Sequence, residues 1–240
     1  SRRSAGMRTV ASRLRRGSGL GSVMPATMLC SDSWERNSGL PNHWTASTAS
    51  NWAPTSGAVK LEGQVLFAPG RRRALPKDLR RRIQMVFQDP QAALNPRLTI
   101  CDLLTEGLVE HRLLRGESRE AAATRLLAEV GLDESALWKY PFEFSGGQRQ
   151  RICIARALAL EPDVVVCDEV VSALDVSVQA QVINLLVDLR RRHGLAYLMI
   201  GHDLSVLRHV AQRLAVMYLG RLAEIGPADS VVGAPQHPYT

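Results

Sequence analysis

Two short segments of the chain carry residue types suited to binding a phosphate and a metal ion. In Phe144–Gln148, a serine hydroxyl and successive backbone N–H groups stand at the expected start of a helix, where they form a site for an anion. The apolar run Val164–Cys167 is followed by Asp168 and Glu169, so two carboxylates stand at the end of a buried strand. One carboxylate suits Mg²⁺ and the other suits a water molecule, the division of roles that phosphoryl transfer needs.

The positive charge of the chain is concentrated in its first residues. The 240 residues carry a formal net charge of +7, and residues 1–31 contain six arginines and no acidic residue. The remainder is therefore close to neutral. The other basic run, from Arg71 to Arg82, contains no aromatic residue that would stack on a nucleic-acid base. The composition therefore argues against a nucleic-acid partner.

Disulfides and membrane spans are not expected. The four cysteines, Cys30, Cys101, Cys153 and Cys167, show no CxxC or zinc-type spacing, which suits a reducing compartment. No apolar run approaches the roughly 18 residues that suggest a membrane-spanning helix. We expect any association with a membrane to go through a partner protein.

The chain divides into two parts of different character. Residues 1–53 are rich in Ser, Arg, Gly, Asn and Thr and show no regular hydrophobic period. From Pro54 onward strands and helices alternate, which favours a mainly parallel sheet covered on both faces. The expected strands are residues 58–67 (two strands with a turn at Gly63), 83–87, 164–168, 195–200, and 214–219 and 221–225, which are joined at Gly220. The expected helices lie within 99–132, at 145–158, at 178–193 (ended by Gly194) and from 202.

In their order and spacing these segments resemble the motifs of ATP-binding-cassette (ABC) ATPases. Phe144–Arg151 is similar to the signature loop, Val164–Glu169 to the Walker B strand and Ser172–Asp175 to the D-loop. Gln88, after an apolar strand, resembles the glutamine of the Q-loop, and His202, at a strand end, resembles the switch histidine. The resemblance covers residues 54–240.

The resemblance implies an α/β fold and a domain arrangement. We expect residues 54–240 to form one ABC ATPase domain with a P-loop NTPase (RecA-like) core. An α-helical subdomain is expected to be inserted after the Q-loop at about residues 96–144, and a small antiparallel β region is expected at residues 58–67.

The resemblance also implies a catalytic site for ATP and Mg²⁺. Asp168 is the expected Mg²⁺ ligand, and Glu169 is expected to polarise the attacking water. Gln88 is expected to reach both the Mg²⁺ and that water, and His202 to sense the γ-phosphate. The family pattern has proline after the glutamate, whereas this chain has Val170. Valine restores a backbone N–H and frees φ, so we expect a small geometric change and no loss of chemistry.

A second set of residues is expected to act between two ATPase subunits. Ser145, Gly146, Gly147 and Gln148 are expected to bind the γ-phosphate of ATP held by the opposite subunit, where glycine lets the backbone approach closely. Asp175, in the D-loop, is expected to lie at the dimer interface and to help place the nucleophile.

Within this family the chain is most similar to the ATP-binding subunits of oligopeptide, dipeptide and nickel importers. This likeness rests on the segments 83–90, 93–97, 172–181, 216–221 and 237–240. It implies ATP hydrolysis that drives import of peptides or similar small solutes. The expected partners are a second ATPase subunit, transmembrane permease subunits and, indirectly, an extracytoplasmic solute-binding protein. The expected location is peripheral, at the cytoplasmic face of the membrane, and family chains continue beyond Thr240.

The P-loop pattern G-x-x-G-x-G-K-[ST] that such an ATPase needs is absent from the sequence. The spacing places it at Arg36–His43, where Asn42 replaces the lysine and Pro41 removes a backbone N–H from the phosphate cradle. Two explanations are open. The subunit has degenerated and binds nucleotide poorly, or a reading-frame disruption has altered residues 1–53, which are otherwise expected to be disordered.

Two alternatives to an active importer ATPase follow. In the first, the chain is a non-catalytic partner that contributes Ser145 and Gly147 to the ATP of another subunit. In the second, it is a soluble DNA-repair or chromosome-structure ATPase of the wider ABC group. The Q-loop context and the His237–Thr240 tail argue against the second, as does the lack of a coiled-coil pattern in the helical region.

Overall fold

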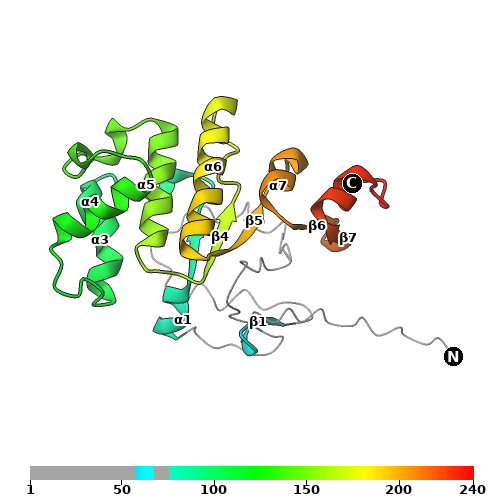
Figure 1. Cartoon of the computed structure of the whole chain (residues 1–240), viewed down its shortest axis with the longest axis horizontal. Coiled ribbons are helices and arrows are strands. Elements are labelled where there is room, and N and C mark those ends of the chain that lie inside the picture. Colours follow the sequence, from blue (N-terminus) through cyan, green and yellow to red (C-terminus); the bar gives the residue numbers. More distant parts are fainter. Residues whose placement is uncertain (1–57, 68–75) are drawn as a thin grey trace.

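The computed structural model describes residues 58–67 and 76–240 (Figure 1). The strands are β1 (Val59–Leu61), β2 (Gln64–Phe67), β3 (Ile83–Val86), β4 (Val164–Asp168), β5 (Ala196–Ile200), β6 (Arg213–Tyr218) and β7 (Arg221–Pro227). The helices are α1 (Lys77–Arg82), α2 (Pro90–Ala93), α3 (Ile100–Glu110), α4 (Arg119–Glu129), α5 (Gly146–Leu158), α6 (Val176–His193), α7 (Leu204–Val210) and α8 (Ala228–Gly233), with 3₁₀ turns η3 (Glu134–Ala136) and η4 (Pro141–Glu143). The predictions for residues 1–53, including the P-loop position at 36–43, lie outside the described residues.

A three-stranded parallel sheet lies at the centre of the described structure. Strand β4 pairs with β3 on one side and with β5 on the other. These strands are short apolar runs with buried side chains such as Val165 and Cys167, as expected for a parallel sheet covered by helices. The registers Val86↔Cys167 and Asp168↔Ile200 bring the carboxyl ends of all three strands to one edge. Residues that follow the strands therefore meet at that edge.

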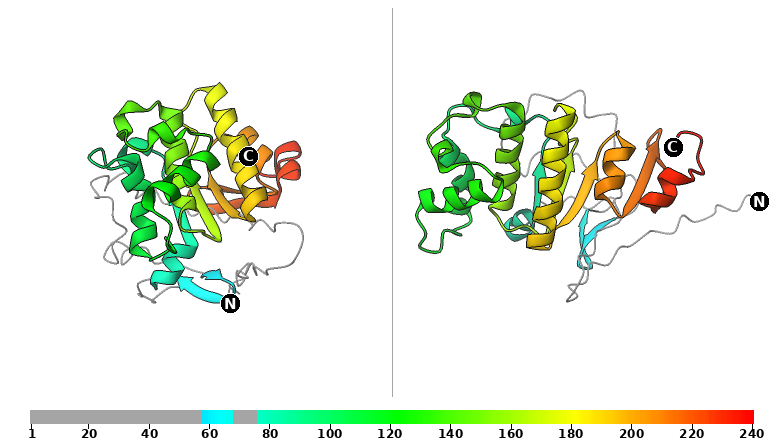
Figure 2. Two further views of the ribbon diagram at one scale, coloured as in Figure 1. Left: turned by 60° about the vertical axis from the view of Figure 1, so that its left-hand side comes forward. Right: turned by 45° about the horizontal axis from the view of Figure 1, so that its top comes forward.

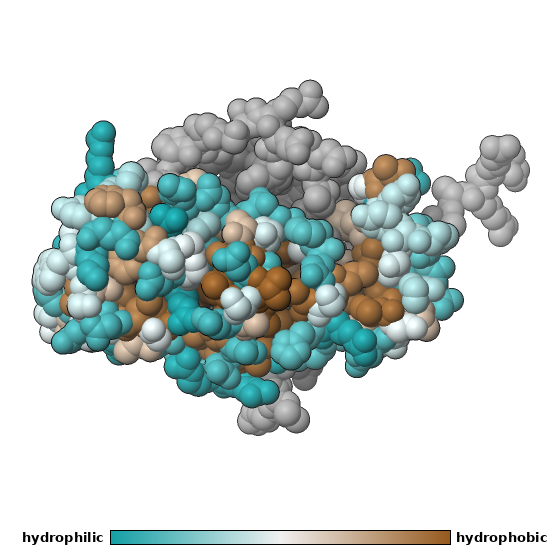
Figure 3. Space-filling view, turned by 90° about the horizontal axis from the view of Figure 1, so that it is seen from above, coloured by the Kyte–Doolittle hydropathy of each residue, from teal (hydrophilic) through white to brown (hydrophobic). Residues whose placement is uncertain are grey.

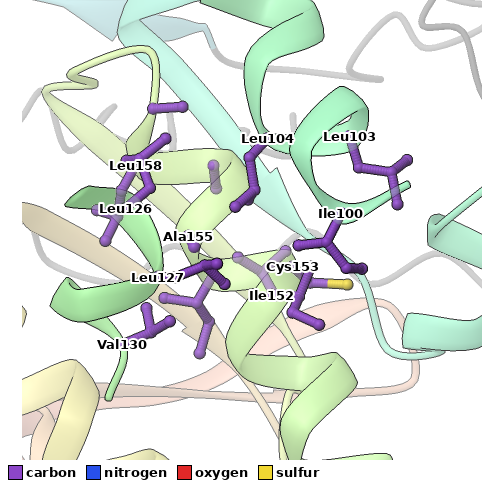
Figure 4. Close-up of a cluster of buried hydrophobic side chains, with 14 of the residues drawn as sticks. Ile100, Leu103, Leu104, Leu126, Leu127, Val130, Ile152, Cys153, Ala155 and Leu158 are labelled. Atoms are coloured by element: carbon purple, nitrogen blue, oxygen red, sulfur yellow. The ribbon is translucent and has the colours of Figure 1, made fainter. Parts of the chain in front are cut away.

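Helices α3, α4 and α5 gather at one end of the molecule, beside the sheet (Figures 1 and 2). Their facing side chains belong to the largest hydrophobic cluster, in which Leu127 and Ile152 are fully buried. Figure 4 shows the part of this cluster that lies among the three helices. The chain therefore builds a helical unit between β3 and β4, as expected, while the bounds of the subdomain at about 96–144 remain a prediction.

The helix ends follow local signals in the sequence. The Ser118 hydroxyl accepts a hydrogen bond from the Ala121 N–H at 3.1 Å and so caps α4. Gly194 adopts a φ of 65° and closes α6. Helix α6 begins at Val176, earlier than the expected residue 178. Val176 is 82% exposed, so the apolar period that places the helix from sequence does not include it.

Two antiparallel hairpins flank the parallel sheet. Strands β1 and β2 are joined at Glu62 and Gly63, with φ values of 49° and 84°, and β6 and β7 at Leu219 and Gly220, with 47° and 72°. Positive φ at both central residues is typical of the two-residue turn that matches the twist of a hairpin. The turns predicted at Gly63 and Gly220 are confirmed.

The cysteines of the described residues have a structural role. Cys153 on α5 and Cys167 on β4 are buried, and loss of hydration raises the pKa of each thiol to about 12. Both thiols are therefore protonated at neutral pH and pack as small apolar groups.

The described surface carries hydrophobic residues among a larger number of polar ones (Figure 3). Strands β6 and β7 and helix α8 lie at the end opposite α3–α5 (Figure 2). Seen from above, the described surface is mostly hydrophilic, with hydrophobic residues gathered near the middle and toward the β6–β7 end (Figure 3). In the described ranges, no helix has the length and apolar character needed to cross a membrane.

Helices α5 and α6 pack closely at Gly147, where a larger residue would not fit. A Cβ atom added to Gly147 would overlap Cγ1 of Val178 on α6, whereas one added to Gly146 would make an ordinary contact at 3.5 Å with Leu174. Gly147 therefore allows the start of α5 to approach α6, and Gly146 is not needed for that contact.

We predict that Gly147→Ala lowers the free energy of unfolding by about 1–3 kcal/mol, the usual cost of overpacking a tight contact. The matched control is Gly146→Ala, which has room for the methyl group and should change stability much less. Urea denaturation of both variants followed by circular dichroism measures the difference. Equal stability of the two variants would contradict the packing argument.

Candidate functional site

The carboxylate of Glu169 is the centre of a polar cluster at the carboxyl edge of the parallel sheet. The Gln88 side-chain amide donates to Oε2 of Glu169 at 2.6 Å. The His202 Nδ1 atom lies 3.1 Å from the other carboxylate oxygen, Oε1. Gln88 follows β3, Glu169 follows β4 and His202 follows β5, so the strand register brings together three residues that are distant in sequence.

The backbone of Glu169 adopts a conformation that is uncommon for a residue with a side chain. Its φ is 45°, in the left-handed region that costs a non-glycine residue roughly 1–2 kcal/mol. Its N–H donates to the Ile200 carbonyl at 2.9 Å. Its carbonyl accepts two hydrogen bonds from Ser172, from the N–H at 3.1 Å and from the hydroxyl at 3.0 Å. These bonds hold the strained residue, and with it the direction of the carboxylate.

Asp168 is a half-buried carboxylate beside Glu169. Loss of hydration, followed by the charge of Glu169, raises the pKa of Asp168. The ionised form of Asp168 is therefore costly in the folded chain, and a bound cation would offset that cost. This electrostatic setting is found where a carboxylate serves a ligand.

The oxygen atoms of Asp168 and Gln88 are of the kind that bind a magnesium ion shared with a phosphate. Mg²⁺ in nucleotide sites uses one or two protein carboxylates, and substrate phosphates and water complete its shell. Asp168 offers one carboxylate, and Gln88 offers an amide oxygen while its amide nitrogen donates to Glu169. Within the described ranges, no group of three or more His, Cys, Asp or Glu side chains forms an all-protein metal site, and such a site is not what a Mg²⁺–nucleotide complex requires.

The predicted signature loop leads into helix α5. Ser145 and Gln148 form a reciprocal cap, in which the Gln148 N–H donates to the Ser145 hydroxyl at 3.3 Å and the Ser145 N–H donates to Gln148 Oε1 at 3.0 Å. Among the described residues, no hydrogen bond engages the N–H groups of Gly146 and Gly147. Those two groups point out of the first helical turn, where the helix dipole favours an anion.

The signature residues and Asp175 are not bonded to the Glu169 cluster. Asp175 is exposed and precedes α6 without a side-chain cap bond. Leu174, its neighbour in the D-loop, lies against Gly146. The D-loop thus adjoins the start of α5, and the predicted roles of these residues between subunits remain predictions.

Two features of the site were not predicted from the sequence. Ser172 was assigned to the D-loop only, and its hydrogen bonds to the backbone of Glu169 depend on a local turn that no residue pattern indicates. Gly147 was assigned to phosphate approach, and the contact with Val178 gives it a second, packing reason.

Comparisons with known proteins identify relatives of this chain. The family model described as ABC transporter matches residues 45–172. The glutathione import ATP-binding protein GsiA of Escherichia coli strain K12 is 54% identical over 186 residues, which are 77% of this chain and 29% of that protein. The chain thus spans less than a third of the length of this curated relative.

Two solved structures are similar in fold. The cbiO1 protein of Clostridium perfringens, part of the ABC transporter complex cbiONQ, has a TM-score of 0.67 and 25% identity, covering 78% of this chain and 72% of that one. The ATP-binding cassette MJ0796, solved as a dimer in a post-hydrolysis state with ADP and Pi, has a TM-score of 0.62 and 27% identity, covering 75% and 77%. The predicted fold, an α/β P-loop NTPase core with an inserted helical unit, is confirmed. The chain belongs to the ABC transporter family.

Proposed function

We propose that the chain is the ATP-binding and ATP-hydrolysing part of an importer for peptides or related small solutes. The observation that carries this proposal is the Glu169 carboxylate held between Gln88 and His202, directly beside Asp168. The relative GsiA is named for import of glutathione, which is itself a small peptide. That name supports the solute class.

In the proposed reaction Glu169 is the general base. Its carboxylate takes a proton from the water that attacks the γ-phosphorus of ATP. Gln88 holds one carboxylate oxygen and orients the same water. The His202 side chain is 73% exposed, against 26% for Glu169. His202 is therefore free to turn toward the γ-phosphate while Glu169 stays in place.

Asp168 and the amide oxygen of Gln88 are the proposed Mg²⁺ ligands. When bound, Mg²⁺ supplies positive charge to the phosphate oxygens. Asp168 is placed by the last residue pair of the β4–β5 register, so its position is fixed by the sheet. Its burial keeps water away from the carboxylate and strengthens its attraction for a cation.

The proposed assembly pairs this chain with a second ATP-binding domain. The free N–H groups of Gly146 and Gly147, with the Ser145 hydroxyl, are suited to the γ-phosphate of ATP on the partner domain. Asp175 is proposed to lie at the same interface. Permease subunits, and through them a solute-binding protein outside the membrane, complete the proposed importer, with this chain peripheral at the cytoplasmic face.

The second candidate function is that of a non-catalytic partner. The sequence contains no Gly-Lys pair, and that pair is central to the P-loop that cradles phosphates. Such a chain contributes Ser145 and Gly147 to ATP held by another subunit and hydrolyses none itself. The importer relatives do not favour the DNA-repair or chromosome-structure alternative.

The first test is ATP binding with and without a P-loop. The isolated chain should bind Mg-ATP weakly or not at all in isothermal titration, because its sequence supplies no phosphate cradle. Fusion of a segment carrying Gly-Lys-Ser ahead of Pro54 should restore binding and hydrolysis. If the repaired chain binds ATP but does not hydrolyse it, the non-catalytic alternative holds, and sub-micromolar binding by the unrepaired chain would contradict our account of the P-loop.

In the repaired chain, Glu169→Gln should lower the hydrolysis rate by about 10²–10⁴-fold, because the amide keeps the shape of the side chain and does not accept the proton. ATP affinity should be unchanged. The matched control is Glu161→Gln, another glutamate with positive φ, at 51°. Within the described ranges, the side chain of Glu161 pairs with Arg115 and lies outside the Glu169 cluster. A parental rate in Glu169→Gln would remove Glu169 from the role of base.

The raised pKa of Asp168 predicts a pH-dependent gain in stability for Asp168→Asn in the presence of a chelator. The folded chain binds the Asp168 proton more readily than the unfolded chain, so parental stability falls as the pH rises through the interval above about 4. Asparagine removes that loss, so the variant should be more stable at pH 7 and equal to the parent below about pH 4.

Asp102→Asn is the control of opposite sign for the same urea titrations. A hydrogen bond from Thr99, together with Arg119, lowers the pKa of Asp102. Ionised Asp102 therefore stabilises the folded chain above its ordinary pKa, and that stability is lost as the pH falls. Asp102→Asn should be less stable than the parent at pH 7. The same sign for both variants would contradict the electrostatic account.

A further inference from the structure

The surroundings of Glu169 differ from those of most other non-glycine residues with positive φ in the described ranges. Six non-glycine residues in the described ranges have positive φ, and three of them, Glu62, Arg115 and Leu219, stand directly before a glycine in an exposed turn. Glu169 stands before Val170, whose side chain is 3% exposed and packed in the main core. The turn at Glu169 is thus built into the core, where specific contacts must hold it.

Those contacts come from one strand, β5, and from one residue of the turn, Ser172. The Glu169 N–H is fixed by the Ile200 carbonyl, which belongs to the sheet. The Glu169 carbonyl is fixed by Ser172 alone among the described residues, through the N–H at 3.1 Å and the hydroxyl at 3.0 Å. A carbonyl oxygen has two lone pairs, so Ser172 satisfies both. The hydroxyl bond is the part of this arrangement that a substitution can remove without breaking the backbone.

The carboxylate direction depends on this backbone. Glu169 Oε2 meets Gln88 at 2.6 Å, and Oε1 meets His202 at 3.1 Å. The Glu169 N–H is held by the sheet, so a change in the φ of Glu169 would swing its Cα–Cβ bond and its carbonyl carbon together. A bond that holds the carbonyl therefore also helps to hold the direction in which the side chain leaves the backbone. Because Gln88 and His202 follow different strands, the carboxylate must lie between them to reach both.

We propose that Ser172 is a positioning residue that acts through Glu169. Its hydroxyl holds the left-handed conformation of Glu169 and so keeps the carboxylate between Gln88 and His202. Ser172 does not touch the reacting atoms in this proposal. The inference rests on the proposed role of Glu169 as general base, and it adds a residue whose contribution is orientation.

The test reads the Glu169 contacts directly, by NMR of the full chain without nucleotide. Ser172→Ala should shift the side-chain amide signals of Gln88 and the ring signals of His202 toward those of unbonded groups. Ser172→Thr keeps a hydroxyl and should retain the parental signals. Ser172→Cys, with a weak S–H donor of similar shape, should shift them as alanine does and serves if Ser172→Ala does not fold.

Ser118→Ala is the matched control, because it also removes a serine hydroxyl that bonds to backbone, at the start of α4. It should leave the Gln88 and His202 signals unchanged, which separates positioning from general loss of stability. Unchanged signals in both Ser172→Ala and Ser172→Cys would overturn the proposal, as would equal shifts in Ser118→Ala. No nucleotide is present, so a repaired chain that failed to hydrolyse ATP would contradict the proposed function and leave this result intact.

Discussion

The pairing register of three parallel strands is the constraint on which the site depends. Glu169 directly follows β4, and β3 and β5 bring Gln88 and His202 to it from either side. A shift of β5 by one residue would move His202 by about 3.3 Å along the strand. Such a displacement would break the 3.1 Å contact between His202 Nδ1 and the Glu169 carboxylate. The same shift would remove the Ile200 carbonyl from the Glu169 N–H. The buried apolar strands fix this register, so packing in the core sets the geometry of polar groups at the edge.

The sequence was sufficient to predict which residues meet at that edge. Each strand is a local apolar run, and each is followed by a polar residue that the core does not need. Since the carboxyl ends of parallel strands meet at one edge, the grouping of Gln88, Glu169 and His202 follows from strand order. The hairpin turns at Gly63 and Gly220 were predictable for the same reason, because the backbone requirement and the residue that meets it are adjacent in sequence.

The parts that could not be predicted depend on contacts with no local signal. The approach of Gly147 to Val178 joins two helices whose contact is decided by how they cross. The start of α6 at Val176 was missed because that side chain faces solvent. The two hydrogen bonds from Ser172 to Glu169 require a positive φ at a residue that is not glycine, and residue preferences argue against that conformation. Each is a case in which tertiary structure overrides a local preference.

Two residues at this edge of the sheet, Glu169 and Asp168, lower the stability of the folded chain, which bears on why the sequence retains them. Strain at Glu169 and a half-buried carboxylate at Asp168 both lower the stability of the folded chain. Substitutions that remove such strain or buried charge are easy to find, and proteins retain these destabilising features mainly at functional sites. A chain that had lost its chemistry would gain stability from asparagine at 168 or glycine at 169. That the chain keeps both carboxylates, Gln88 and His202 in one cluster supports the role in ATP hydrolysis proposed above for this site.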